Sequence, residues 1–281
     1  MEKILLNAGP SERGWHRIES AARCLRLFAW EQAGKLGRVE TEPLIKGSLL
    51  HIGLAQHYAR IQAYQEESDP DMYFTPEEGV RELALREIDR ASPEGARIWD
   101  AAVPIVLSAL KDYEYRWGVE HHRWKVVMVE KQLRATIKSP SGNSFLFTQR
   151  PDLIIQDTNK KYWIVDHKSC YRIVGRTLQQ HILSGQFLGY MTFGKAKYGR
   201  DFGGCIVNRV KLSSPHAFDR STVEPAPSAI RNFTKMLGQT EDIVAQFEGK
   251  DVMEWPATYS DQTCYGKYGQ CPAFDLCRWG D

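Results

Sequence analysis

Two acids and a lysine occupy two short apolar segments near the middle of the chain. Asp152 precedes the run 153–155, and Asp166 and Lys168 lie within the run 163–168. Carboxylates that converge in an apolar setting repel each other, and a hard divalent cation neutralises them. Such a cation polarises a phosphoryl oxygen and acidifies a bound water molecule. These residue types therefore point to metal-dependent hydrolysis of phosphodiesters.

The expected pairing of the two segments brings the three groups together. If a hairpin loop separates Gln156 from Tyr162, these two residues pair. Counting back along the antiparallel ladder then places Asp152 opposite Asp166, on one face of the sheet. Lys168 lies two residues further along that face, where it would orient the attacking water. The alternative is a buried structural Asp–Lys ion pair, because such networks also perturb carboxylates.

Three further polar residues lie on segments with helical periodicity. His51 has mostly apolar neighbours on a helix expected over residues 46–65. A single histidine in such a setting is more often a structural residue than a metal ligand. Gln186 and Tyr190 are four residues apart and share one helix face, where ordinary packing is the alternative.

Four of the six cysteines form a second pattern, in which one lies far upstream and three lie near the end of the chain. They are Cys24, Cys264, Cys271 and Cys277. Zinc ligands usually come in pairs two to four residues apart, and the spacings here are wider. Four thiolates suit an iron–sulfur cluster, with zinc or free thiols as alternatives. Cys170 and Cys205 lie in or beside expected strands and are interpreted as buried apolar side chains.

The elements that must position these residues are mostly helical in the first part of the chain. Helices are expected over residues 17–36 and 46–65, after a capping box at Thr75, and from Ser92 to about Trp117 with a kink at Pro104. Next comes a three-stranded antiparallel meander over 124–135, 145–155 and 162–168. A helix at 175–198, a strand at 202–210, a helix at 228–247 and an irregular stretch at 251–281 follow. This order is typical of an α/β sandwich.

Composition favours a soluble globular protein. The 281 residues are 42% hydrophobic and 26% charged, which excludes disordered, collagen-like and coiled-coil chains. No stretch reads as a membrane span or a targeting segment, and we expect a cytoplasmic protein. The net charge of +2 is unevenly spread: residues 66–100 hold eleven acids and four bases, and residues 195–211 hold five bases and one acid. Such a split suits a basic groove for an anionic polymer, although solvated helix faces would give the same pattern.

Four short motifs in this order resemble the PD-(D/E)XK nuclease superfamily, and most closely its RecB-like exonuclease branch. They are Gly47-x3-His51, Pro151-Asp152, Asp166-x-Lys168 and Gln186-x3-Tyr190. Asp166 stands where glutamate is commoner. The resemblance implies an α/β fold with a central mixed sheet flanked by helices, N-terminal helices and a cysteine-rich C-terminal tail. It implies one nuclease domain over residues 1–281, with a helical part at 1–120, a catalytic core at 121–250 and the tail at 251–281.

The resemblance also implies roles for the residues of the motifs. Mg²⁺ or Mn²⁺ would be held by His51, Asp152, Asp166 and the backbone carbonyl of His167. Lys168 would be the catalytic lysine, and Gln186 and Tyr190 would help position it and the nucleic acid. Glu130 matches a frequent acidic position whose role the resemblance does not define. No motif is recognised in residues 66–117.

The cysteine pattern carries a resemblance of its own. Ser20-x3-Cys24-Leu25-Arg26 and Cys271-Pro272-x4-Cys277 are similar to members of the same branch that have one cysteine before the histidine motif and three near the C-terminus. This implies a [4Fe–4S] cluster on Cys24, Cys264, Cys271 and Cys277. A cluster there would tie the irregular tail to the first helix across a very long loop.

The expected substrate is DNA with linear ends, single- or double-stranded. Basic residues that flank the acids in sequence are candidates for phosphate contacts, with solvated surface charge as the alternative: Arg150, Arg172, Arg176, Lys195 and Lys197. Tyr171, Phe187 and Tyr190 are candidates for stacking on exposed bases, with core packing favoured for Phe187.

These observations give three hypotheses of function. The first is a metal-dependent DNA exonuclease of recombination, repair or end processing in a bacterial or phage-infected cell, with a single-strand annealing recombinase as a partner. The second is a nuclease of CRISPR adaptation that trims spacer precursors beside an integrase. The third is a non-catalytic DNA-binding protein on the same fold. Cleavage polarity, strand preference and oligomeric state are left open.

Overall fold

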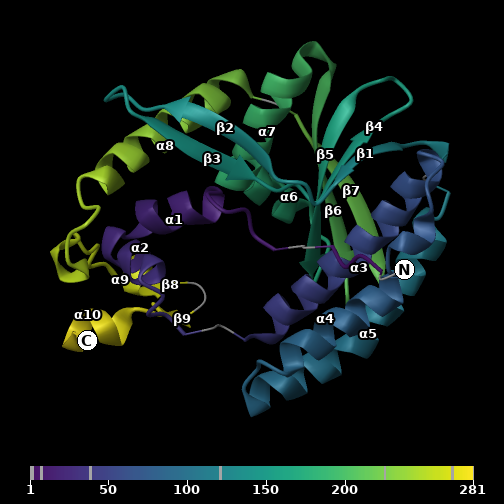
Figure 1. The fold of residues 1–281 in the computed structure, drawn as a ribbon, viewed down its shortest axis with the longest axis horizontal. Coiled ribbons are helices and arrows are strands. Elements are labelled where there is room, and N and C mark those ends of the chain that lie inside the picture. Colours follow the sequence, from purple (N-terminus) through teal and green to yellow (C-terminus); the bar gives the residue numbers. More distant parts are fainter. Residues whose placement is uncertain are drawn as a thin grey trace. The chain divides into compact units, whose positions relative to one another are not determined.

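The computed structural model describes residues 3–6, 9–37, 40–119, 122–224, 226–266 and 269–280, without the side chains of residues 176 and 177. The chain forms two compact units, each assembled from three separate stretches (Figure 1). Unit 1 comprises Met1–Pro10, Glu40–Leu133 and Arg150–Pro227. Unit 2 comprises Ser11–Val39, Arg134–Gln149 and Ser228–Asp281.

Three long helices form the first layer of unit 1. They are α3 (Glu42–Gln65), α4 (Pro76–Ile88) and α5 (Pro93–Trp117), which lie side by side in Figure 1. The capping box expected at Thr75 is confirmed, because Thr75 and Glu78 each accept a hydrogen bond from the other's backbone N–H. Ser92 caps α5 through Gly95, and α5 continues through Pro104. The helical starts could therefore be predicted from their capping residues.

The sheet of unit 1 is mixed, as expected. Its strands β1 (Lys125–Val129), β4 (Leu153–Gln156), β5 (Tyr162–Cys170), β6 (Phe202–Lys211) and β7 (Ala217–Val223) are hydrogen-bonded in the order β1-β4-β5-β6-β7. Only the β5–β6 contact among these is parallel. The connection from β5 to β6 runs through α6 (Gly175–Ile182) and α7 (Gly185–Tyr198), as a parallel pair requires a crossover.

The predicted three-stranded meander is wrong. The segments 124–135 and 145–155 each break into two strands, so β1 pairs with β4, whereas β2 (Leu133–Lys138) and β3 (Ser144–Gln149) form a separate sheet. After β1, Glu130 has a left-handed φ of 49°, which ends the strand. Before β4, Pro151 has no N–H to donate to a ladder. The predicted register of the remaining hairpin is confirmed, because Gln156 pairs with Tyr162.

Two predicted helices are interrupted. The helix expected at 17–36 is divided into α1 (Trp15–Arg23) and α2 (Leu25–Gln32) by Cys24, whose φ of −164° and ψ of 117° are extended. The helix expected at 175–198 is divided at Ser184, whose hydroxyl caps α7. Strand 202–210 is confirmed as β6, whereas β7 was not predicted.

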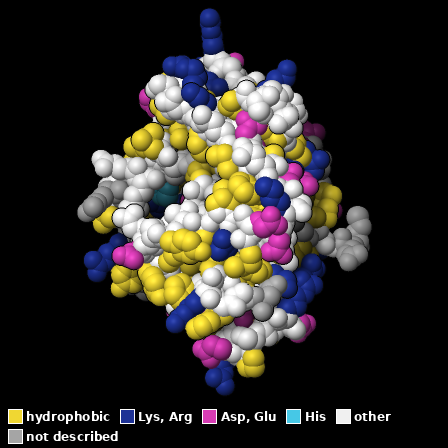
Figure 2. Space-filling view, turned by 90° about the vertical axis from the view of Figure 1, so that its left-hand side faces the viewer, with side chains coloured by type: hydrophobic (Ala, Val, Ile, Leu, Met, Phe, Trp, Pro, Cys, Tyr) yellow, Lys and Arg dark blue, Asp and Glu magenta, His cyan; other side chains and the backbone are white. Residues whose placement is uncertain are grey.

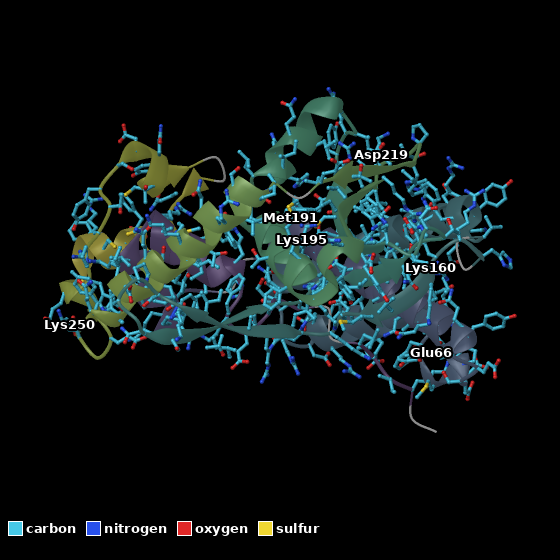
Figure 3. The ribbon with its side chains drawn as sticks, turned by 90° about the horizontal axis from the view of Figure 1, so that it is seen from above. Glu66, Lys160, Met191, Lys195, Asp219 and Lys250 are labelled. Carbon is cyan, nitrogen blue, oxygen red and sulfur yellow. The ribbon has the colours of Figure 1, made fainter. Side chains whose placement is uncertain are left out.

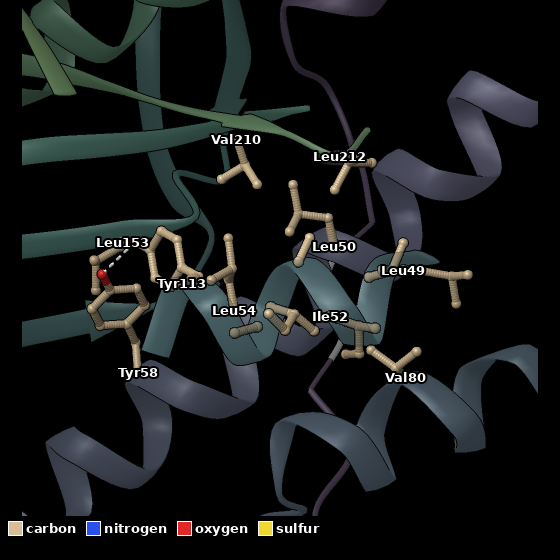
Figure 4. Packing of buried hydrophobic residues seen from close by; sticks show 14 of the residues in the cluster. Leu49, Leu50, Ile52, Leu54, Tyr58, Val80, Tyr113, Leu153, Val210 and Leu212 are labelled. Carbon is tan, nitrogen blue, oxygen red and sulfur yellow. Dashed lines mark hydrogen bonds between the residues drawn. The ribbon is translucent and has the colours of Figure 1, made fainter. Parts of the chain in front are cut away.

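The core of unit 1 lies between α3, its neighbouring helices and the sheet. Leu49, Leu50 and Leu54 are fully buried in it (Figure 4). Successive residues of β5 point to opposite faces of the sheet. The ring of His167 stacks on Tyr58 of α3, whereas the carboxylate of Asp166 contacts α7. Residues of β5 therefore contact α3 on one face of the sheet and α7 on the other face.

Unit 2 combines α1 and α2 with β2, β3, helix α8 (Pro227–Ala245) and the last part of the chain. A buried ion pair joins Arg17 to Glu241 at 3.1 Å. The terminal part contains short elements at Val252–Glu254, α9 (Asp261–Cys264), β8 (Tyr265–Gly266), β9 (Gly269–Gln270) and α10 (Phe274–Trp279).

The face of the protein drawn in Figure 2 has no large patch in which all charged side chains carry the same sign. Lysine, arginine, aspartate and glutamate side chains are interspersed there with hydrophobic ones. In the described ranges, no helix combines the length and the apolar character that a bilayer crossing needs.

Candidate active site and metal centre

Three potential metal ligands converge in unit 1 from three different elements. His51 comes from α3, Glu130 follows β1 and Asp152 precedes β4, and one ligand atom of each lies within 4.8 Å of those of the other two. The two carboxylates suit a hard cation such as Mg²⁺ or Mn²⁺, and the imidazole of His51 adds a nitrogen donor that divalent transition metals accept. The residues therefore fit a divalent cation.

Glu130 reaches this group through an unusual backbone conformation. Its left-handed φ of 49° is uncommon for a residue with a side chain, and its N–H donates to the backbone oxygen of Asp152 at 3.0 Å. Such conformations persist where the surrounding structure holds them, and they concentrate at functional sites. The bend that ends β1 thus also places an acid beside Asp152.

Asp152 is fixed through both of its carboxylate oxygens. Oδ1 lies 3.3 Å from Nδ1 of His51, and Oδ2 accepts the backbone N–H of His167 at 2.6 Å. Burial raises the pKa of Asp152, but the charge and hydrogen bond of His51 outweigh that effect, and the pKa lies well below its ordinary value. Asp152 is therefore an anionic and well-oriented ligand.

A second polar cluster surrounds Asp166 on the α7 face of β5. Lys168 Nζ lies 2.8 Å from Asp166 Oδ2. Asp166 Oδ1 accepts hydrogen bonds from Gln186 Nε2 at 3.0 Å and from Tyr190 OH at 3.1 Å. Lys168 Nζ also donates to Gln186 Oε1 at 2.9 Å. The glutamine thus bridges the acid and the lysine.

The charges of the two clusters influence each other. Burial raises the pKa of Asp166, and the charge of Asp152 raises it further, against the effect of Lys168. Burial lowers the pKa of Lys168, but the two aspartates outweigh burial and hold it above its ordinary value. The aspartates therefore favour the charged form of Lys168.

Glu130 has the opposite protonation behaviour to Asp152. Burial and then the charge of Asp152 raise the pKa of Glu130 well above its ordinary value. Without a cation, Glu130 therefore retains a proton at pH values where an exposed glutamate is ionised. Cation binding by carboxylates requires that proton to leave.

A buried polar network lies behind His167, on the α3 face of β5. Burial lowers the pKa of His167 to about 3, so its ring is neutral. Its Nδ1 lies 2.7 Å from Nδ2 of Asn208, and Asn208 also contacts Tyr113 and Arg220. Sequence reasoning missed Asn208, Tyr113 and Arg220. A signal existed at Asn208, a polar residue directly after the apolar run 205–207 of an expected strand.

The four cysteines of the predicted cluster line one cavity of about 240 Å³ in unit 2. In the described part of the chain, no three of their sulfur atoms lie within 4.8 Å of one another. Cys24 Sγ accepts the backbone N–H of Thr258 at 3.4 Å, and the N–H of Cys271 donates to the carbonyl of Cys264 at 2.8 Å. Burial raises the pKa of the thiols of Cys271 and Cys277. The cavity therefore brings the four cysteine residues into one region, but their sulfur atoms are not clustered.

The other two cysteines lie elsewhere. Cys205 is fully buried in β6, as expected, and burial raises the pKa of its thiol well above the ordinary value. Cys170, at the end of β5, is half-buried.

The basic residues expected at the site differ in their surroundings. Arg150 is half-buried, donates to the carbonyl of Gly9 at 3.2 Å and lies near enough to lower the pKa of Glu130. Arg172 is exposed beside the ring of Tyr171. Lys195, next to Met191 in Figure 3, and Lys197 are exposed toward the far end of α7. They lie about 13 and about 16 Å along the helix from Gln186, respectively. The side chain of Arg176 lies outside the described part of the structure.

The three aromatic residues that were expected to stack on bases differ in their exposure to solvent. Tyr171 is 76% exposed. Phe187 and Tyr190 are buried and present no free ring face, so stacking on a base is wrong for both. The hydroxyl of Tyr190 is committed to Asp166 instead.

Comparison with known proteins extends these observations. Residues 15–278 match the family model of the PD-(D/E)XK nuclease superfamily. A comparison with curated proteins found no match. Among solved structures, the chain is similar to a "putative exonuclease" from Eubacterium rectale, with 11% identity, a TM-score of 0.49, and coverage of 96% of this chain and 88% of that one. It is also similar to the protein SSO0001, with 12% identity, a TM-score of 0.33, and coverage of 72% and 77%. The family match spans nearly the whole sequence, and the chain belongs to the PD-(D/E)XK nuclease superfamily.

Proposed function

We propose that the protein is a Mg²⁺- or Mn²⁺-dependent deoxyribonuclease that degrades linear DNA from its ends. The observation that carries this proposal is the convergence of His51, Glu130 and Asp152 next to the Asp166–Lys168 pair. A largely buried set of ionisable groups of this kind is costly to keep, and it suits phosphodiester hydrolysis better than passive binding of DNA. The exonuclease assignment, and a role in recombination, repair or end processing, rest on the resemblance to the RecB-like branch.

Each residue of the site has a distinct task in the proposed reaction. His51, Glu130 and Asp152 would hold the divalent ion, with Asp166 and the carbonyl of His167 as further ligands. A bound ion would supply Lewis acidity toward the phosphate and lower the pKa of a coordinated water molecule.

Lys168 remains protonated and places its ammonium group where negative charge grows on the phosphate. Gln186 fixes the ammonium group through its Oε1 and holds Asp166 through its Nε2. Tyr190 contributes a hydrogen bond to Asp166 from within the core. Gln186 and Tyr190 therefore position the acid and the lysine.

We also assign a [4Fe–4S] cluster to Cys24, Cys264, Cys271 and Cys277. The shared cavity supports it. Burial raises the pKa of the thiols of Cys271 and Cys277, and the charges of Arg23 and Arg26 offset only part of that effect. The cluster would serve as a structural link between the α1–α2 corner and the end of the chain.

The test of the nuclease proposal compares end-labelled linear DNA with covalently closed circular DNA, in Mg²⁺, in Mn²⁺ and in a chelator. We expect linear DNA to be degraded only with a divalent ion and circular DNA to stay intact. Asp152→Asn and Lys168→Ala should abolish the activity, whereas Lys138→Ala, at an exposed position of β2, should not. Equal cleavage by the wild-type protein and the Asp152→Asn variant would refute the proposal.

A further inference from the structure

The polar network behind His167 connects the residues that would hold the metal to the interior of unit 1. His167 takes part in both the metal site and the network. Its backbone N–H donates to Asp152 at 2.6 Å, and its ring enters the network. Movement of His167 would therefore move the hydrogen bond that orients Asp152. The following inference rests on the proposed metal site.

Three members of the network form one row across neighbouring strands. His167 on β5 is the register partner of Asn208 on β6, and Asn208 is the register partner of Arg220 on β7. Side chains of register partners lie on the same face of a sheet, in contact distance. The strand pairing itself therefore brings the three groups together.

The hydrogen bonds fix which atoms donate. Arg220 Nε has no lone pair to offer and donates to Oδ1 of Asn208 at 3.2 Å, which identifies Oδ1 as the amide oxygen. The other amide atom, Nδ2, is then a donor and must donate to Nδ1 of His167 at 2.7 Å. The neutral His167 ring consequently carries its hydrogen on Nε2. Asn208 thus selects one tautomer and one ring orientation.

Arg220 is anchored in turn by the two long helices α3 and α5. Its NH2 group donates to the hydroxyl of Tyr58 at 3.1 Å and to that of Tyr113 at 2.7 Å, and these hydroxyls lie 2.8 Å apart. Its guanidinium lies over the rings of Trp117 at 3.8 Å and Trp124 at 4.4 Å. Cation–π contacts and shared hydrogen bonds of this kind restrict a long side chain strongly.

The network also reaches the helix that carries His51. Tyr58 follows His51 by seven residues, which places both on one face of α3 two turns apart. The ring of Tyr58 stacks on that of His167, with 5.7 Å between centroids and 11° between planes. The same cluster therefore holds α3, which carries one ligand, against β5, which orients another.

We propose that Asn208 and Arg220 are positioning residues for the metal site, which fix His167 and through its backbone fix Asp152 relative to His51. Neither residue would touch the metal or the substrate. Hydrogen-bond partners of ligand-bearing groups typically change metal affinity by about 10- to 100-fold when they are removed. We expect losses in this range.

The experiment measures Mn²⁺ binding to the full-length protein directly, by titration calorimetry or by the electron paramagnetic resonance of free Mn²⁺. The variants are Asn208→Leu and Arg220→Met. The matched control is Arg209→Met, because Arg209 is also a buried arginine of the same sheet and pairs with Asp219 rather than with the network. Thermal unfolding of each variant reports its general loss of stability.

We expect Asn208→Leu and Arg220→Met to weaken Mn²⁺ binding about 10- to 100-fold, and Arg209→Met to lower Tm while leaving Mn²⁺ affinity within about twofold. Tyr113→Phe removes one shared hydroxyl with little loss of packing, and it keeps the test valid if a larger change unfolds the protein. It should weaken Mn²⁺ binding by a few-fold.

Unchanged Mn²⁺ affinity in all three network variants would overturn the inference while leaving the proposed function intact. An equal loss of affinity in Arg209→Met would also overturn it, because the effect would then be general destabilisation. His51→Ala separates this failure from that of the proposed function. If the wild-type protein and His51→Ala bind Mn²⁺ equally, the metal site itself is wrong, and both proposals fall.

Discussion

Lys168 and Asp166 form an ion pair of 2.8 Å in which the carboxylate is fully buried and the lysine side chain is 29% exposed. Lys168 is thus the more accessible member of the pair. The buried acid also accepts hydrogen bonds from Gln186 and Tyr190. This arrangement explains why the lysine stays charged and why its position is well defined.

Replacement of Lys168 by alanine should reduce DNA cleavage by at least about 100-fold, since one lost charge-stabilising donor costs about 10²–10³ in rate. Mn²⁺ binding should persist in this variant, because the lysine is no ligand. Because the pKa of Lys168 is raised, the lysine is still charged at the ordinary pKa of a lysine and loses its charge only at a higher pH. The cleavage rate of the wild-type protein should therefore show no alkaline fall from this group between pH 8 and about pH 10.

Glu130→Gln should change stability and metal affinity in opposite directions. A folded-state pKa above the unfolded value means that stability is present at low pH and is lost as pH rises through the folded-state pKa. The glutamine removes this loss, so the metal-free variant should have a higher Tm than the wild-type protein at pH 8. Its Mn²⁺ affinity should fall, because a carboxylate ligand is gone.

The control for Glu130 is Glu12→Gln, since Glu12 is an exposed acid in unit 2. This change should alter neither quantity. Calorimetry in two buffers of different ionisation enthalpy would further show proton release on Mn²⁺ binding to the wild-type protein. A Glu130→Gln variant with full Mn²⁺ affinity would exclude Glu130 as a ligand.

The iron–sulfur assignment predicts a brown protein when it is purified without oxygen, with stoichiometric iron and sulfide. Cys24→Ser and Cys277→Ser should lose the colour and most of the iron, and Tm should fall. Cys170→Ser is the matched control, because Cys170 lies outside the cavity that the other four cysteines line. Retention of iron by Cys24→Ser would contradict the assignment. Zinc in place of iron would show that the four cysteines bind zinc instead.

The buried ion pair of unit 2 predicts an asymmetric response to substitution. Arg17 and Glu241 have side chains that are only 9% and 8% exposed. Glu241→Ala would leave a buried guanidinium without this partner, and removal of one member of such a pair costs about 3–5 kcal/mol. Urea unfolding should show that the double variant Arg17→Met/Glu241→Ala is less destabilised than the sum of the single changes. Strict additivity would mean that the pair does not interact.

Local signals in the sequence predicted the helix starts and one strand register. Thr75 and Ser92 act within three residues of the backbone groups that they bind, so their roles need no knowledge of the rest of the fold. The hairpin between Gln156 and Tyr162 is equally local. The observed ladder ends at Leu153 and Val165, so Asp152 lies just beyond the paired residues.

Only those site residues that belong to the four recognised motifs could be predicted from the sequence. The positive φ of Glu130 has no signature in the residues around it, so the division of the meander was not foreseen. Asn208 and Arg220 acquire their roles from strand pairs that join residues 41 and 12 positions apart, and neither distance is fixed by local sequence. Partners of this kind emerge only when the sheet is assembled.

The interleaving of the two units has a consequence for biosynthesis. Unit 1 needs Arg150–Pro227 to complete its sheet, and unit 2 needs Ser228–Asp281 in addition to its two earlier stretches. Synthesis of residues 1–133 therefore completes neither unit. The apolar faces of α3, α4 and α5 stay uncovered by the sheet until the ribosome has added the strands that follow.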